Sequence, residues 1–155
     1  MSAASRLRES IETAYPRLSA ISDTDAAIAP ALGKWSPKQV IGHLIDSASN
    51  NHQRFVRANF IDDLVFAGYD QEKWVVLGNY ANAPWNSLLS LWREFNFQIA
   101  RVMDATPASV RDISRTRHNL HQVAWSAVPE SESATLGYFM SDYVDHLEHH
   151  LRQIG

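Results

Sequence analysis

The apolar residues of this chain recur at three- and four-residue steps along its whole length, and no stretch shows the strict alternation of a half-buried strand. Such steps predict amphipathic helices, because 3.6 residues per turn bring these positions onto one face. The first helix is expected over residues 3–20. Its apolar stripe consists of Leu7, Ile11, Ala14, Tyr15 and Leu18. Pro16 falls within that stripe and predicts a kink or an early end of the helix there.

A second helix is expected from Ser36 to about Phe60. Ser36 and Pro37 are typical of a helix start, since Ser is a favourable N-cap and Pro lacks the N–H that the first helical position leaves unpaired. One side of this helix is apolar at both ends but carries small or polar residues, including Ser47 and Asn51, in its middle. A helix that only packs against a core does not need polar groups there, so we expect a pocket beside them.

A third helix should open at Pro84, with Asn82 or Ala83 as its cap, and should run to about Met103. Its apolar face is continuous over this length. Pro107 then starts a short turn, because its fixed φ suits the first position of a helix.

The last helix is expected to start near Ser133 and to end at Gln153 or Ile154. Its apolar residues alternate between four- and three-residue steps, a spacing that requires a partner helix. The four helices together predict an all-α fold, a four-helix bundle in a single domain. The connections over residues 61–82 and 113–132 are long, so we expect crossovers rather than a series of simple hairpins, with at most a short helical turn in the first of them.

Composition supports one ordinary globular domain, expected to span residues 1–155. The 14 Lys and Arg against 17 Asp and Glu give a formal charge of −3, which argues against nucleic acid as a partner because phosphates attract basic surfaces. The absence of Cys excludes disulfides, Cys-ligated zinc, iron–sulfur clusters and a cysteine nucleophile. No apolar run approaches the ~20 residues that span a bilayer, and the N-terminus is unlike a secretory signal, so we expect a cytoplasmic protein with no membrane partner.

Histidine has an unusual distribution. Five of the seven histidines lie in the last 38 residues, and three of them crowd into five positions near the C-terminus. His146 and His150 are four residues apart on the last helix, so both imidazoles project from one side, as two ligands of a single metal ion would. His149 lies about 100° from His150 around the helix axis and is expected to point outward or to stand behind a ligand.

A third ligand would have to come from another helix, and His43 is the best candidate because it shares a side of the second helix with the polar residues described above. Asp46, three residues on, could orient His43 or a bound water. Three neutral imidazoles with an open coordination position are the arrangement of a catalytic metal rather than of a closed structural site. An all-nitrogen donor set suits a divalent ion, with Zn or Ni expected ahead of Fe or Co.

Two structural alternatives stand beside the metal site. A histidine at a heptad position can be a core residue that is hydrogen-bonded to a neighbour. The DHLEHH run could instead be a solvated last turn whose protonated histidines complement the helix dipole. This second alternative explains His149 but not His150, which continues an apolar stripe. His52 has no spacing relation to the others and is expected at the surface.

Aromatic and basic residues give weaker indications. Trp35 and Trp92 are assigned to the core, because aromatic residues at helical spacing are more often core than binding site. Trp74 and Trp125 lie in the two long connections and are candidates for pocket walls.

A small basic cluster occurs in the segment RTRHNLH, which holds Arg115, Arg117, His118 and His121. Two interpretations stay open: an exposed loop, which is favoured, or an anion-recognition site near the metal, since guanidinium forks suit carboxylates.

Two segments resemble signatures of the DinB-like (DinB/YfiT-like) superfamily. KWSPKQVIGHLIDS resembles its second-helix signature, in which a Trp-Ser start precedes a His followed by Leu. HLEHHLRQI resembles its C-terminal signature, a His–three–His pair followed by Gln-Ile. The spacing between these segments and the third helix, PWNSLLSLW, match as well, so the resemblance covers nearly the whole chain.

The resemblance implies a four-helix bundle that binds a divalent metal through His43, His146 and His150. Characterised members are thiol S-transferases or isomerases that use a low-molecular-weight thiol such as bacillithiol, mycothiol or glutathione, and members are often homodimers. The basic cluster at residues 115–121 has no matching family residue.

Three hypotheses about function follow. The leading one is a metal-dependent transferase: the metal deprotonates an external small-molecule thiol, which then attacks an electrophilic substrate. In it the three histidines are ligands, Asp46 is at most an orienting group, and no residue is singled out as general base. The second hypothesis is a hydrolase that uses water activated by the metal. The third is a non-catalytic, stress-related binding bundle.

Overall fold

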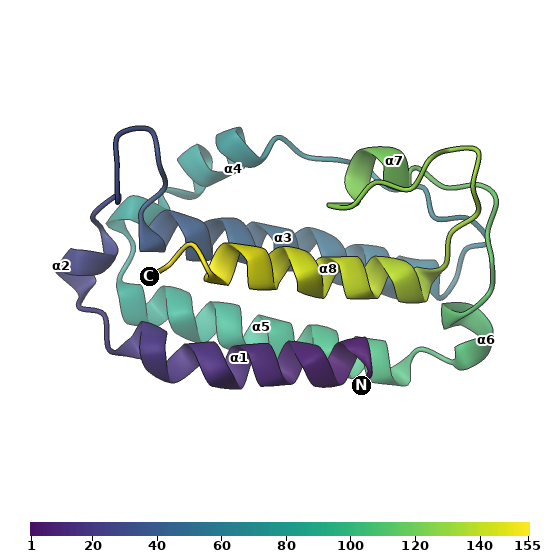
Figure 1. The fold of residues 1–155 in the computed structure, drawn as a ribbon, viewed down its shortest axis with the longest axis horizontal. Helices are drawn as coiled ribbons and strands as arrows, with labels where there is room; N and C mark the ends of the chain where they lie inside the picture. The colour runs from purple at the N-terminus through teal and green to yellow at the C-terminus, as the bar shows by residue number, and fades with distance from the viewer.

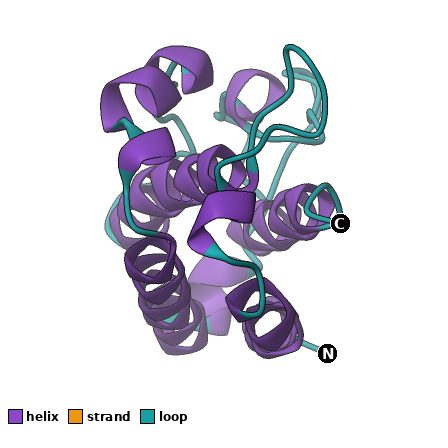
Figure 2. Ribbon diagram, turned by 90° about the vertical axis from the view of Figure 1, so that its left-hand side faces the viewer, coloured by secondary structure: helices purple, strands orange, loops and turns teal.

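A computed structural model describes all 155 residues, and its architecture is set by four long helices with no β-sheet (Figure 1). The long helices are α1 (Ala3–Ser19), α3 (Pro37–Ala58), α5 (Trp85–Ala105) and α8 (Leu136–Leu151). They lie side by side as a four-helix bundle, which confirms the predicted all-α fold (Figures 1 and 2).

Shorter helices occupy the connections. These are α2 (Asp23–Ala26), α4 (Gln71–Gly78), the 3₁₀ helix η1 (Tyr80–Asn82), α6 (Ala108–Arg111) and α7 (Leu120–Val123). The turn predicted after Pro107 is α6. The first long connection is more helical than predicted, since α4 and η1 take up half of residues 61–82, and α7 lies in a stretch predicted to be irregular.

The chain direction of the long helices brings two distant segments together. Helices α3 and α5 run one way along the bundle, whereas α1 and α8 run the other way (Figure 1). The connection between α3 and α5 must therefore travel back along the whole bundle, and it carries α4 above α3. Because α3 and α8 are antiparallel neighbours, the first turns of α3 lie beside the last turns of α8.

The core is apolar and is built by all four long helices. Helix α1 buries only apolar side chains: Ala4, Leu7, Ile11, Ala14 and Leu18. Helix α5 packs most extensively against α1 and α3, whereas α3 and α8 approach each other less closely. Helices α4 and α7 and their connections lie on one side of the bundle, over α3 and α8, whereas α2 and α6 lie at its two ends (Figures 1 and 2).

Several predicted boundaries shift in the structure. Helix α1 continues past Pro16 to Ser19, because Leu18 is fully buried and its packing offsets the hydrogen bond that proline cannot donate. Helix α8 starts at Leu136 rather than near Ser133, since the Thr135 hydroxyl accepts the N–H of Tyr138 and caps it there.

The cap of α5 comes from a distant residue. Neither Asn82 nor Ala83 caps this helix, and Pro84 at the N-cap position has no side-chain acceptor to offer. Asp23 of α2 instead accepts the backbone N–H of Trp85 at 2.7 Å. The same carboxylate also binds Lys38 of α3 at 3.0 Å, so one exposed side chain ties three helices together.

None of the helices combines the length and the apolar character that a membrane span requires.

Candidate metal centre

The three histidines predicted as metal ligands lie together at one end of the bundle. His43 is in the second turn of α3, and His146 and His150 are in the last turns of α8. One ring nitrogen from each lies within 4.8 Å of the other two, and the Nε2 atoms of His43 and His146 are 3.1 Å apart. Antiparallel packing of α3 and α8 produces this convergence from positions more than a hundred residues apart in the chain.

The start of α3 is firmly held, which places His43. Ser36 and Gln39 form a capping box: the Ser36 hydroxyl accepts the Gln39 N–H, and the Gln39 side chain accepts the Ser36 N–H at 2.9 Å. Trp35 lies just before the cap and packs against the His43 ring, with ring centroids 5.0 Å apart. Trp35 is only half-buried and borders the histidine cluster, so its assignment to the core is correct in part; Trp92 is fully buried, as predicted.

A close approach of η1 to α3 fixes the next residue of the site. The Tyr80 ring lies where a side chain at Gly42 would be, 2.1 Å from an ideal Cβ, so only glycine fits at this position. The Tyr80 hydroxyl donates to Oδ1 of Asp46 at 2.5 Å. Asp46 is therefore held by Tyr80, and the predicted contact with His43 is not made. Two buried atoms on this turn, Nδ1 of His43 and Oδ2 of Asp46, have no hydrogen-bond partner.

Electrostatics keep the histidine cluster neutral. Burial, with a smaller effect of His150, lowers the pKa of His43 from 6.5 to about 4. Burial also lowers the pKa of His146 to about 3, helped by the neighbouring histidines. The pKa of His150 is lowered by burial as well, although Nδ1 of His150 pairs with Oε1 of Gln153 at 2.9 Å. Unprotonated imidazoles at neutral pH can bind a cation without first losing protons.

The donor set fits a divalent transition-metal ion. Two nitrogens bound to one ion at about 2.0–2.1 Å stand about 2.9 Å apart at a right angle and about 3.3 Å apart at a tetrahedral angle. The 3.1 Å between His43 and His146 falls within this range. No carboxylate or thiol joins the three imidazoles in the cluster, so it supplies three ligands and leaves further coordination positions open.

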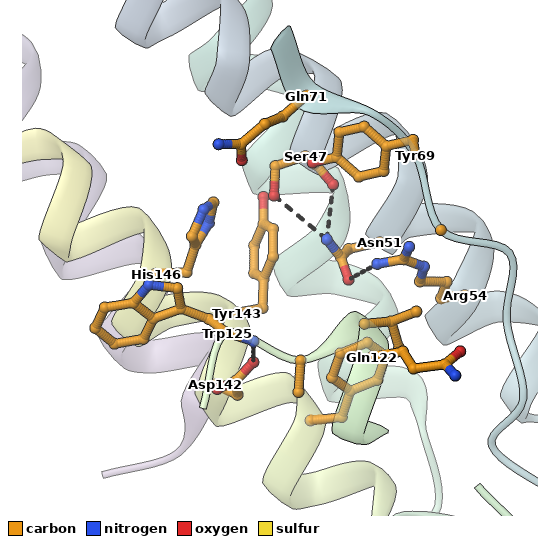
Figure 3. Close-up of a pocket in the computed structure, with 14 residues that line it drawn as sticks. Ser47, Asn51, Arg54, Tyr69, Gln71, Gln122, Trp125, Asp142, Tyr143 and His146 are labelled. Carbon is orange, nitrogen blue, oxygen red and sulfur yellow. Dashed lines mark hydrogen bonds between the residues drawn. The ribbon is translucent and has the colours of Figure 1, made fainter. Parts of the chain in front are cut away.

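A cavity of about 320 Å³ opens from His146 along the seam between α3 and α8 (Figure 3). Ser47, Asn51 and Arg54 of α3 line one wall, and Tyr69 closes it from the connection above. The polar residues in the middle of the second helix therefore face a pocket, as predicted. Asp142 and Tyr143 of α8 also line the cavity. Sequence reasoning missed Arg54, Tyr69, Asp142 and Tyr143.

Trp125 forms a wall of this cavity, and Asp142 holds it there. The carboxylate of Asp142 accepts the backbone N–H groups of Trp125 and Ser126 at 2.8 and 2.7 Å. The Trp125 ring lies 6.4 Å from that of His146 and 5.1 Å from that of His149, centroid to centroid. Its predicted role as a pocket wall is confirmed. Trp74 packs instead on Tyr69 and lines a separate hollow beside Phe66.

The remaining histidines lie outside the cluster. His149 is half-buried against Trp125, behind His150, as its angle around the helix predicted. His52 is partly buried beside Phe95 rather than fully exposed at the surface.

The basic cluster is largely structural, so neither interpretation of it is correct for its two buried members. Arg115 donates to backbone carbonyls that include those of Ala58 and Val110 and ties the end of α3 to the second connection. His118 accepts the N–H of Leu120 at Nδ1, which leaves Nε2 to donate to the Glu132 carbonyl. Arg117 is exposed, as an open loop requires, and lies 3.4 Å from Asp63.

The family model of the DinB superfamily matches residues 6–154. This chain belongs to the DinB superfamily. A solved structure has the same fold as this DinB-superfamily protein: YfiT from Bacillus subtilis, described as a probable metal-dependent hydrolase with an unusual four-helix bundle topology. The two superpose with a TM-score of 0.78 over 98% of this chain and 81% of the other, at 21% identity.

A protein of Oceanobacillus iheyensis, which its name provisionally assigns to the metal-dependent hydrolases, is 32% identical to this DinB-superfamily chain over 123 residues. The match covers 79% of this chain but 64% of the relative, which is thus the longer protein.

Proposed function

We propose that this protein is a divalent-metal-dependent enzyme that transfers a low-molecular-weight thiol to an electrophilic small molecule. The observation that carries the proposal is the convergence of three neutral imidazoles, from His43, His146 and His150, at the end of a cavity large enough for a small molecule. The names of the relatives, which refer to metal-dependent enzymes, support the metal.

The chain's own residues would bind the ion and shape its surroundings. A divalent ion such as Zn²⁺ or Ni²⁺ would lower the pKa of a thiol or water that it coordinates and so supply a nucleophile near neutral pH. The chain has no Cys, so a thiol would have to come from outside. Trp35 packs against His43 and Trp125 lies beside His146, so two aromatic rings border the cluster.

A second candidate function is hydrolysis, in which water rather than a thiol is the nucleophile. The names of both relatives favour it, since each refers to a metal-dependent hydrolase. It would use the same three histidines and the same cavity.

Metal content tests the part that both candidates share. Wild-type protein without a His tag should bind close to one divalent ion per chain, and His43→Ala, His146→Ala and His150→Ala should each lose most of it, because each removes one of three ligands. His149→Ala is the matched control, a neighbouring histidine outside the cluster, and should keep the ion. Full metal stoichiometry in His150→Ala would contradict the site.

A thiol panel separates the two candidates. The metal-loaded protein is incubated with an electrophile, such as an activated aryl halide or an ester, with and without cysteine, glutathione, bacillithiol or mycothiol. Transfer predicts turnover that requires one of the thiols and yields a thioether, thioester or similar conjugate. Turnover of the ester in the absence of every thiol would instead establish hydrolysis.

A further inference from the structure

Arg54 is a buried cation without an anion. Its side chain is on α3, the residue is 6% exposed, and no carboxylate lies within 4.0 Å of the guanidinium. It donates to Oδ1 of Asn51 at 3.3 Å and to the carbonyl of Ala67 at 2.8 Å. These bonds occupy two of the five N–H donors of a guanidinium.

Arg54 lies at the cavity, so its unpaired N–H groups are within reach of a ligand there. The side chain lines the cavity that starts at His146, and Figure 3 shows the two residues on opposite sides of it. The guanidinium carbon lies 5.9 Å from the Tyr69 ring and 6.0 Å from the Phe139 ring, so aromatic faces flank it. Burial of a charge costs free energy unless a partner compensates it. The hydrogen bonds to Asn51 and Ala67 could be made by a neutral side chain and do not require a charge.

Arg115 provides an internal comparison. It is also 6% exposed and also lacks a carboxylate, but it lines none of the main cavities and directs its donors at backbone carbonyls from three segments. Arg115 is a structural tie, and each of its terminal nitrogens donates to more than one carbonyl. The terminal nitrogens of Arg54 make one hydrogen bond each, so three of its five N–H donors have no partner beside the cavity.

We propose that Arg54 binds a carboxylate of the substrate or thiol, at the end of the cavity away from the histidine cluster. This inference rests on the proposed function, because it takes His146 to mark the reacting end of the cavity. The ligand class is a small molecule with its reacting group at one end and a carboxylate at the other.

Charge and shape favour a carboxylate over a phosphate. The planar guanidinium fork matches the two oxygens of a carboxylate in a bidentate pair. The same cavity is lined by Asp142, so its walls carry one cation and one acidic group, and a second negative charge on the ligand would be poorly compensated. A monoanion is the better match.

The helix spacing sets the length of the ligand. His43, Ser47, Asn51 and Arg54 follow one face of α3, and eleven residues separate the first from the last, which corresponds to about 16 Å of helix. Arg54 lines the cavity, and His43 contacts His146, which lines its other end. A chain of several bonds between the reacting group and the carboxylate is therefore required, and a two-carbon mercapto acid would be too short.

The test uses 6-mercaptohexanoate and its neutral amide as a matched pair of probes, with affinities measured by calorimetry on zinc-loaded and on metal-free protein. Wild type should prefer the carboxylate by about tenfold to a hundredfold in both forms. Arg54→Gln should lose that preference while it keeps the zinc content, and Arg54→Lys, which keeps the charge but not the fork, should lie between. Helical circular dichroism and the unfolding midpoint report whether each variant folds.

The two proposals can fail separately. If wild type binds no zinc, the proposed metal site is wrong, but the carboxylate preference of the metal-free protein still decides the role of Arg54. If wild type binds both probes equally, or if folded Arg54→Gln keeps the preference, the assignment of Arg54 is overturned whatever the metal content. Should Arg54→Gln not fold, the wild-type ratio and Arg54→Lys give the decision.

Discussion

The seam between α1 and α5 and the seam between α3 and α8 are built from different kinds of side chain. Helix α1 buries only apolar side chains, and α5 buries Trp92 and Ile99 with no exposed area. Helix α3, by contrast, buries an imidazole, a carboxylate, an amide and a guanidinium on the side that faces α8 and the connections. The first seam is a packed core, and the second contains the cavity.

The difference shows how one bundle separates stability from a reactive site. Apolar burial contributes stability roughly in proportion to area, whereas each buried polar group costs free energy unless it is hydrogen-bonded. Helix α3 carries two orphaned polar atoms next to the cluster, at His43 and Asp46, whereas the orphaned Nε1 of Trp92 lies among apolar side chains. We therefore expect substitutions in the first seam to change the stability of the protein and to leave the metal site intact. In the second seam, we expect protonation of the histidines to destabilise the metal-free protein.

Trp92→Ala should give the largest change. Trp92 is fully buried, and its Nε1 has no hydrogen-bond partner, so its contribution is packing. We expect the free energy of unfolding to fall by about 3 to 5 kcal/mol because the truncation leaves a large void. Chemical denaturation measures it, with zinc content as the second readout, which should stay near wild type in the folded fraction.

Leu91→Ala is the control for this experiment. Leu91 is the neighbouring residue on the same helix and is 52% exposed, so its truncation should change stability by about 0.5 kcal/mol or less. Similar losses in the two variants would mean that α5 does not bury the face seen in the structure.

Acid should act on the other seam, with a smaller effect. The folded-state pKa values of His43 and His146, about 4 and about 3, lie below the ordinary 6.5. As the pH falls through 6.5, the unfolded chain takes up protons that the folded chain does not, so the free energy of unfolding decreases. We expect a loss of about 2 to 4 kcal/mol for the metal-free protein between about pH 6.5 and pH 4, and no contribution from these groups above it.

Denaturation curves of metal-free protein across this pH range check the expectation. The double variant His43→Leu, His146→Leu replaces both rings by apolar side chains and should lose most of the acid dependence. An unchanged slope in that variant would place the acid sensitivity at other groups, such as the carboxylates of the ion pairs on α1 and α8.

The fold could be predicted from the sequence because its signal is local. Three- and four-residue apolar steps define each long helix, and Ser36-Pro37 marks the start of α3 at the residue seen in the structure. The histidine cluster could be predicted for the same reason, since two of its members share one helix turn. Only His43 required a guess about which helices pack together, and the polar middle of α3 indicated the face.

Beyond Trp125 and the polar residues of α3, the walls of the cavity could not be predicted, because they depend on contacts between distant segments. Asp142 looks like a solvated helix residue until the connection at Trp125 folds back onto it. Asp23 likewise caps α5, and Tyr80 bonds Asp46 of α3, although nothing in the sequence around either residue indicates these contacts. The buried tie made by Arg115 is invisible in sequence, since a buried arginine and an exposed one have the same letter and the same polar neighbours.

Ser36→Ala should have the smallest effect, and it tests whether the start of α3 can be weakened without loss of the site. The Ser36 hydroxyl accepts the N–H of Gln39, and removal of an N-cap acceptor costs about 1 kcal/mol of stability. Zinc stoichiometry should be kept, because His43 lies about two turns further on and is held by its packing against Trp35.

Ser2→Ala is the matched control, since Ser2 caps α1 with the same geometry but at an exposed chain end far from the histidines. Its cost should be lower because a terminal turn that frays loses little when its cap is removed. Denaturation and metal analysis on both variants decide the matter. A loss of zinc from Ser36→Ala but not from Ser2→Ala would show that the capping box positions His43. Equal stability of Ser36→Ala and wild type would mean that the cap does not form in solution.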